Sequence, residues 1–171
     1  MDWNDFVSNV QEWAKARGIT DNSTAFAQLE KAVEEYGEVT RARLKDDLDE
    51  LRDGIGDVLV CLVNAASIFG VDLQAPTQQD LFGTDPRALM VQWHRGVVEL
   101  GSEFLWGGRN PEYVARKFDA LVSVIAHHAV YAGVNLEECQ HVAWEAIKDR
   151  RGFLSPEGVF IKEEPTVPQG D

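Results

Sequence analysis

Apolar residues recur every three or four positions through residues 29–68, and no other feature constrains the fold of this chain so strongly. Residues three or four apart lie on one face of a helix, so the spacing predicts amphipathic helices. A short charged stretch at residues 45–48 divides the segment. The spacing therefore predicts two successive helices, at 25–44 and at 49–69.

The same periodicity predicts further helices, and we expect an all-α bundle of about four principal helices with accessory ones. The additional helices are expected at 2–17, 87–105, 111–133 and 136–151. Residues 71–86 show little periodicity and are expected to form a loop. Near the end of the chain, residues 155–158 predict a turn and residues 159–161 a short strand.

Acidic residues gather on the helices at 25–44 and 49–69. They are Glu34, Glu35 and Glu38 on the first helix and Asp53 and Asp57 on the second. Like charges at this spacing repel each other, and the repulsion increases beside an apolar face. Divalent cations would relieve the repulsion, and oxygen ligands favour hard ions such as Mg²⁺ or Mn²⁺. The pattern therefore predicts a metal site.

Three glycines interrupt the same two helices, Gly37 in the first and Gly54 and Gly56 in the second. A glycine inside a helix costs roughly 1 kcal/mol relative to alanine. Close approach of another helix, or of a ligand, would explain them. Asn64 follows Asp57 by two turns on the same face, where it is either a satisfied core residue or a donor to a ligand.

Composition limits the partners that we expect. The 171 residues include 16 basic and 29 acidic side chains, a formal net charge of −13, with no visible basic patch, so a nucleic-acid partner is not expected. No apolar run approaches about 18 residues without a charge, so neither is a membrane. Cys61 and Cys139 lie in apolar helical patterns and predict free thiols. Free thiols and the absence of a signal peptide favour the cytoplasm, the host cytoplasm for a viral protein.

Two parts of the chain resemble each other weakly. VVELGSEF at 97–104 is similar to VEEYGEVT at 33–40, and AGVNLEE at 132–138 is similar to FGVDLQA at 69–75. Ser123 stands where the second copy would need its second acid. We interpret this as a degenerate duplication of a helical pair, in which one half carries the chemistry. A chance likeness between amphipathic helices is the alternative.

The acidic pattern also resembles that of a known family. Glu-Glu-x-x-Glu at 34–38, followed by Asp-x-x-x-Asp at 53–57 within DGIGDVLV, is similar to the MazG-like all-α nucleoside triphosphate pyrophosphohydrolases. That superfamily includes dimeric dUTPases and dCTPases. The segment AWEAIKDRRGFLSPEGVFIKEE at 143–164 also resembles the C-terminal signature of its phage members.

The resemblance implies one domain over residues 1–164, followed by a flexible tail at 165–171. Residues 1–74 would hold the catalytic helices. Residues 75–134 would be an insertion or the degenerate repeat. Residues 135–164 would supply a C-terminal helix and a turn that contacts phosphate.

The activity that the resemblance implies is hydrolysis of a nucleoside triphosphate to the monophosphate and pyrophosphate, by attack of water at the α-phosphorus. Two or more Mg²⁺ ions, for which Mn²⁺ would substitute, would neutralise the triphosphate and stabilise the attacking and leaving oxygens. Glu35, Glu38 and Asp57 would hold metal. Glu34 would share metal contact or accept the proton from water.

One ligand departs from the family pattern. The usual second motif is Glu-x-x-Asp, with the acid three residues before the final Asp, but position 54 is Gly in this chain. Either Asp53 or Glu50 must supply the fourth ligand.

Substrate contacts are expected from basic, amide and aromatic residues. The candidates are Lys31, Arg150, Arg151 and Lys162 for phosphate, Asn64 for the sugar or base, and Trp13 for stacking. Each basic residue could equally be a solvated surface charge, and Trp13 a core residue. The likeness to phage members favours (d)GTP as the substrate, with dUTP or dCTP as alternatives.

Two other classes of function were weighed. A di-iron or di-manganese carboxylate bundle needs two Glu-x-x-His motifs, but the chain has one, at residues 138–141. A non-enzymatic helical interaction module would make the acidic clusters solvated faces. Against it, few basic residues other than Lys31 and Arg52 lie near them. Because one bundle would leave Trp3 and Trp13 partly exposed, we also expect a homodimer or homotetramer, as the resemblance implies.

Overall fold

The computed structural model describes residues 1–77, 85–108 and 110–163, and these residues form an all-α fold, as predicted. The helices are α1 (Trp3–Ala16), α2 (Ile19–Asn22), α3 (Ala25–Lys45), α4 (Leu48–Phe69), α5 (Pro86–Trp106), α6 (Pro111–Ala132) and α7 (Leu136–Ile147). A small antiparallel hairpin follows, β1 (Gly152–Leu154) paired with β2 (Phe160–Lys162). Among the described residues, no helix combines the length and apolarity that a membrane crossing requires.

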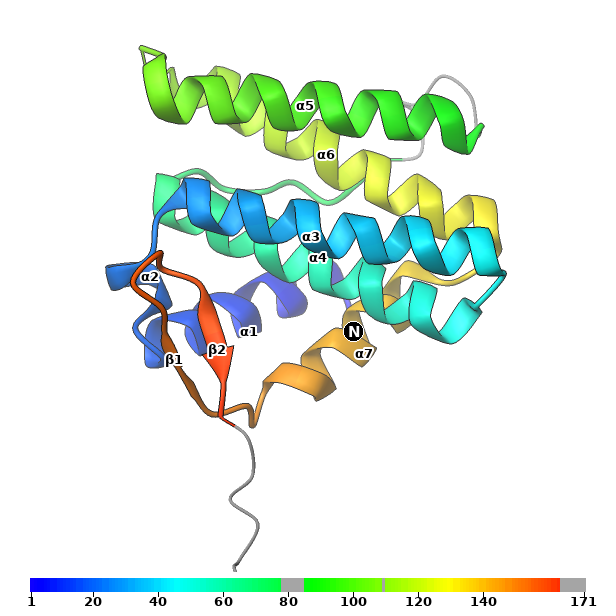
Figure 1. The fold of residues 1–171 in the computed structure, drawn as a ribbon, viewed down its shortest axis with the longest axis horizontal. Coiled ribbons are helices and arrows are strands. Elements are labelled where there is room, and N and C mark those ends of the chain that lie inside the picture. Colours follow the sequence, from blue (N-terminus) through cyan, green and yellow to red (C-terminus); the bar gives the residue numbers. More distant parts are fainter. Residues whose placement is uncertain (78–84, 109, 164–171) are drawn as a thin grey trace, which may run out of the picture.

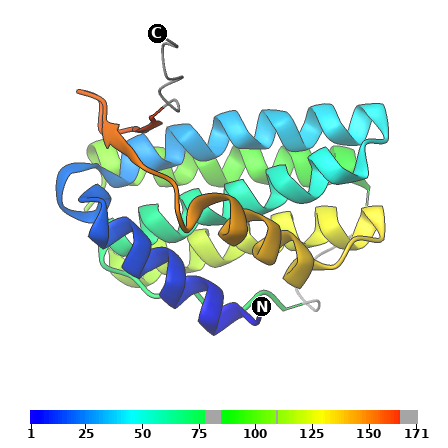
Figure 2. The ribbon, with the colours of Figure 1, turned by 90° about the horizontal axis from the view of Figure 1, so that it is seen from below.

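Helix α4 is the centre of the molecule. It contacts α3, α6, α1 and α7, and an almost unbroken series of its residues is buried from Leu51 to Ala66. The α5–α6 pair lies on one side of the α3–α4 pair, and α1 and α7 lie on the other side, where they cross α4 (Figures 1 and 2). A helix that is apolar all round must be covered on every side, so the composition of α4 accounts for this layering.

Several element boundaries differ from those predicted. No helix was predicted between residues 17 and 25, but Ile19–Asn22 form the short helix α2, and Thr24 caps α3 by accepting from Ala27 N at 3.0 Å. Helix α7 ends at Ile147 instead of residue 151. The cause is Arg17, which donates from Nε to the Arg150 carbonyl (2.7 Å) and from Nη2 to the Lys148 carbonyl (2.9 Å).

Two of the three helical glycines mark close helix contacts, as predicted. A Cβ at Gly56 would overlap the Cys139 carbonyl and the Ala143 side chain of α7, and a Cβ at Gly54 would lie 3.2 Å from Val39 of α3. Gly37 has no neighbour within 4 Å outside its own helix, so no described helix explains it.

The reason given for oligomerisation was wrong, because Trp3 and Trp13 are only 9% and 6% exposed within a single chain. The oligomeric state itself stays a prediction. The α3–α4 and α5–α6 pairs stack on each other, as a duplicated pair would, but the duplication also stays a prediction.

Candidate functional site

A cavity of about 60 Å³ lies beside α3 and α4, under the C-terminal hairpin. Six of the predicted site residues line it: Trp13, Lys31, Glu35, Asp57, Asn64 and Arg150. They come from α1, α3, α4 and the segment after α7, so the fold brings together residues that are far apart in sequence. Val159 and Phe160 of the hairpin region complete the lining.

Two carboxylates face this cavity from neighbouring helices. Glu35 of α3 is 7% exposed, and Asp57 of α4 is half-buried. The pKa of Asp57 is raised to about 7: burial raises it most, the nearby Glu35 and Asp53 also raise it, and Arg150 and Lys31 lower it. The cavity therefore favours a cation, because a positive charge here would remove the cost of ionising Asp57.

Lys31 supplies one such cation. Its Nζ lies 2.6 Å from Glu35 Oε1 and 2.9 Å from Glu34 Oε2. Burial lowers the pKa of Lys31, but the hydrogen bonds with Glu35 and Glu34 outweigh burial, and the net shift is upward. Lys31 is therefore paired with acids and also lines the cavity.

Three buried polar atoms around the cavity have no hydrogen-bond partner among the described residues. They are Trp13 Nε1, Asn64 Oδ1 and Arg150 Nε. The other end of the Asn64 amide donates from Nδ2 to Gln28 Oε1 at 3.3 Å. Most buried polar groups in proteins are paired, so three unpaired atoms around one cavity indicate a site for polar ligand atoms.

The five other predicted ligands and contacts lie outside the cavity. The Glu34 side chain is 67% exposed, and that of Glu38 is 41% exposed beside Arg41. Asp53 and Arg151 are exposed. Lys162 is also exposed, on β2. The five expected carboxylates thus do not converge on one point in this structure.

Glu50, the alternative fourth ligand, accepts a hydrogen bond from Arg41 Nε at 2.8 Å. Arg41 also lies 3.3 Å from Glu38, so it neutralises both acids. Arg41 was not among the residues predicted from the sequence. Among the described residues, no group of three His, Cys, Asp or Glu side chains is placed to hold a metal ion.

The donors that do face the cavity fit one Mg²⁺ ion. Mg²⁺ in nucleotide sites is usually held by one or two carboxylates, with waters and substrate phosphates completing its octahedron. Glu35 and Asp57 supply two carboxylates, and Asn64 supplies an unpaired amide oxygen. A second ion would need Glu34, Glu38 or Asp53 to change rotamer.

Sequence reasoning missed two residues that shape the cavity. Gln28 lies three residues before Lys31 and seven before Glu35, on the same helix face, so periodicity could have identified it. Phe160 packs its ring edge-on against Trp13, with centroids 5.5 Å apart. No local signal identifies Phe160, because its position depends on the pairing of β1 with β2.

Comparison with known proteins gives one partial likeness. The chain is 32% identical over 71 residues to an uncharacterized 18.2 kDa protein in the rep-hol intergenic region of Haemophilus phage HP1 (strain HP1c1). The match covers 42% of this chain and 44% of the phage protein, so the chain spans less than half of that relative's length. No protein-family model and no solved structure matches the chain.

Proposed function

We propose that this protein is a metal-dependent nucleoside triphosphate pyrophosphohydrolase of the MazG-like type, which converts a (d)NTP and water to the (d)NMP and pyrophosphate. The supporting observation is that two carboxylates and two cationic side chains line one cavity. The carboxylates, Glu35 and Asp57, come from adjacent helices, and the cations are Lys31 and Arg150. Carboxylates for Mg²⁺ beside cations for phosphate are the groups that phosphoryl chemistry requires.

In this proposal Glu35 and Asp57 hold the metal, with the Asn64 amide oxygen as a further donor. Mg²⁺, when bound, supplies Lewis-acid stabilisation of the phosphoryl oxygens. Lys31, which pairs with Glu35 in this structure, would contact phosphate together with Arg150 once Glu35 serves as a ligand. Glu34, which lies outside the cavity and pairs with Lys31, would have to turn inward to accept the proton of the attacking water while the bond between the α-phosphorus and the pyrophosphate oxygen breaks.

The hairpin has to move for a nucleotide to enter. A cavity of about 60 Å³ holds roughly two waters at about 30 Å³ each, whereas ligand pockets measure about 300–1,000 Å³. Val159 and Phe160 cover the cavity, and the hairpin contacts the helices through Trp13 and through Gln28 Nε2, which donates to the Gly158 carbonyl at 3.4 Å. Displacing Phe160 exposes the Trp13 ring as a stacking surface for a base.

Pyrophosphate release from each canonical dNTP and NTP in the presence of Mg²⁺ tests the proposal. We expect dGTP or GTP to be cleaved fastest; preference for dUTP or dCTP would change the substrate but not the reaction. Products must be the monophosphate and pyrophosphate, separated by chromatography. Failure to cleave any nucleotide would refute the assignment.

A second candidate function is a non-enzymatic helical interaction module. The observation that favours it is charge pairing. Arg41 lies close to both Glu38 and Glu50, so more of the acids have a cationic neighbour than the sequence indicated. Helix α5 also leaves Trp106 81% exposed and Val98 66% exposed. Such a module would melt at the same temperature with and without Mg²⁺, whereas a metal site gains stability on binding.

A further inference from the structure

Exposed apolar side chains are concentrated on the face formed by α3 and α5, two helices that contact each other and lie side by side in Figure 1. Among the described residues, seven of the thirteen exposed large apolar side chains belong to these two helices. They are Val33 and Leu44 on α3, and Met90, Val91, Val98, Leu105 and Trp106 on α5. Exposed apolar side chains that gather on one face mark a surface that binds another molecule.

The exposed residues of α5 follow a seven-residue repeat. Val91, Val98 and Leu105 are seven residues apart, and each side chain is more than half exposed. Because seven residues are almost two helical turns, the three side chains lie in one line along the helix. This repeat is the pattern by which one helix packs against another, and no described helix of the chain covers it.

A second line of the same kind runs along α3. Phe26, Val33, Gly37 and Leu44 are separated by seven, four and seven residues, so they share one face of the helix. A glycine inside a helix is destabilising, yet a Cβ at Gly37 would meet no neighbouring atom within 4 Å. The close approach of a helix from outside the chain accounts for Gly37, since the missing side chain lets two backbones come together.

An apolar groove of about 250 Å³ lies between the two helices on this face. At Phe26 and Leu105 the groove adjoins a cavity of about 570 Å³, whose walls include Phe104. Trp106 also lines the groove and is the most exposed apolar side chain of the face. A face with both a protruding ring and a hollow can be complementary to itself, because a two-fold axis brings the ring of each copy to the hollow of the other.

The distribution of charge makes a second copy the occupant that suits this face. Helix α3 carries four acidic and four basic residues and α5 carries two of each, whereas α4 and α7 each have a net charge of −3. Two chains of net charge −13 repel each other least where their surfaces are neutral. Glu30 lies between Phe26 and Val33 on α3, and Arg95 lies between Val91 and Val98 on α5. Their opposite charges favour α3 of one copy against α5 of the other.

We propose that two copies of this chain associate through the α3–α5 face, with α3 of each copy packed against α5 of the other. Residues 26–44 span about 27 Å and two adjacent helices are about 20 Å wide, so the flat area of the face is roughly 500 Å². The relief of the side chains raises the accessible area toward the roughly 800 Å² that each partner buries in a standard interface. None of the residues in the two lines borders the cavity beside Glu35 and Asp57, so the dimer leaves that cavity open.

Sedimentation equilibrium of the full chain tests the proposal. The wild type should be a dimer at micromolar concentration. Val98→Glu should raise the dissociation constant of the dimer at least about 100-fold, because it places like charges in an apolar interface. Val142→Glu is the matched control, since Val142 is an exposed apolar residue of α7 outside the face. That variant should dimerise as tightly as the wild type.

Gly37→Leu probes the same face without disturbing a single chain, because no described neighbour limits a side chain at this position. It should keep the helix content of the wild type by circular dichroism and weaken the dimer at least about tenfold, through overpacking. The proposal is overturned if the wild type is a monomer, or if Val98→Glu or Gly37→Leu dimerises as tightly as the wild type. Dissociation of Val142→Glu to the same extent as Val98→Glu would also overturn it. Should Val98→Glu lose helix content, Gly37→Leu still decides.

Discussion

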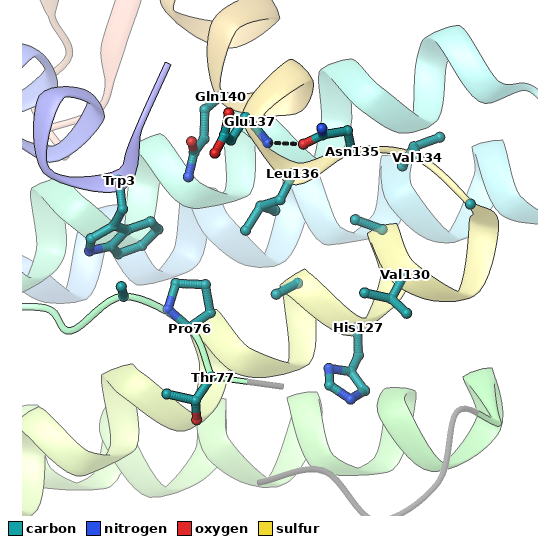
Figure 3. A pocket seen from close by; sticks show the side chains of 14 residues that line it. Trp3, Pro76, Thr77, His127, Val130, Val134, Asn135, Leu136, Glu137 and Gln140 are labelled. Atoms are coloured by element: carbon teal, nitrogen blue, oxygen red, sulfur yellow. Dashed lines mark hydrogen bonds between the residues drawn. The ribbon is translucent and has the colours of Figure 1, made fainter. Parts of the chain in front are cut away.

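The cavity beside α3 and α4 differs in size and in lining groups from a cavity that lies between α6, α7 and the segment after α4 (Figure 3). The one beside α3 and α4 measures about 60 Å³ and contains two carboxylates, a lysine and an arginine. The one between α6 and α7 measures about 570 Å³ and is mainly apolar, and its lining includes Gln140, whose buried amide oxygen has no hydrogen-bond partner among the described residues. In the first, ion pairs and the overlying Phe160 hold the walls close together. In the second, no ion pair joins the described lining residues.

The comparison teaches that cavity volume alone does not identify a catalytic site. Charged groups drawn together by mutual attraction occupy the space that a metal and a substrate would need, as Lys31 does beside Glu35. The smaller cavity therefore contains more of the groups that could bind a metal ion and phosphate. The four predictions that follow test this difference, in order of decreasing effect.

Glu35→Gln should lower nucleotide hydrolysis at least about 100-fold, or about 2.7 kcal/mol in the activation barrier. The substitution keeps the shape of the side chain but removes a charge that the metal needs. Steady-state pyrophosphate release measures it. Glu30→Gln, an exposed position on the same helix, should retain full activity. Equal loss in both variants would indicate a general charge effect.

Mg²⁺ should raise the free energy of unfolding through the first cavity only. At a concentration about 100 times the dissociation constant, the gain is about 2.7 kcal/mol. Thermal melting with a Mg²⁺ titration measures it. Glu35→Gln should lose the gain and Gln140→Met should keep it. A gain that survives in Glu35→Gln would mean that the ion binds elsewhere.

Asp57→Asn should stabilise the metal-free protein above neutral pH. The folded pKa of Asp57, about 7, lies above the unfolded value, so the folded state holds the proton more tightly. The contribution of the bound Asp57 proton to the free energy of unfolding is complete below the unfolded pKa near 3.9. It falls as the pH rises toward 7, and it is absent above pH 7. A pKa raised from near 3.9 to about 7 corresponds to about 4 kcal/mol, and solvent screening of this half-buried side chain should reduce the gain from removing the ionisable group to roughly 2 kcal/mol at pH 8.

Urea denaturation at several pH values measures the Asp57 effect. The gain from Asp57→Asn should shrink as the pH falls toward 4. Asp72→Asn, at an exposed position, should show no such trend. A pH-independent gain would contradict the assignment of the raised pKa to Asp57.

Gln140→Met should have the smallest effect. Replacing an unpaired buried amide by an apolar side chain of similar shape is nearly neutral or stabilising, by up to about 1 kcal/mol. Urea denaturation measures this change. A loss of more than about 1 kcal/mol would show that Gln140 makes a stabilising bond in the folded protein.

Sequence periodicity predicted the helices well because each depends on local spacing and capping. It also placed Lys31, Glu35, Asp57 and Asn64 together, since these residues repeat at three-, four- or seven-residue intervals on two paired helices. It grouped Glu34 with Glu35, although adjacent helical residues point about 100° apart. The structure accordingly leaves Glu34 exposed.

Features that depend on distant contacts could not be predicted. The early end of α7 results from Arg17, more than 130 residues away in sequence. The position of Phe160 over the cavity depends on the pairing of residues 152–154 with 160–162. Local patterns contain no information on either contact. Arg41 differs, because it follows Glu38 by three residues on the same helix and helical spacing could have identified it.

The hydrogen bonds from Arg17 to the Lys148 and Arg150 carbonyls fix the backbone immediately before the hairpin begins. Any outward swing of the hairpin must therefore pivot after residue 150. The Arg150 backbone would stay with the helices while Phe160 moves with the hairpin. Arg17 thus determines where the hairpin would hinge, although Arg17 does not line the cavity.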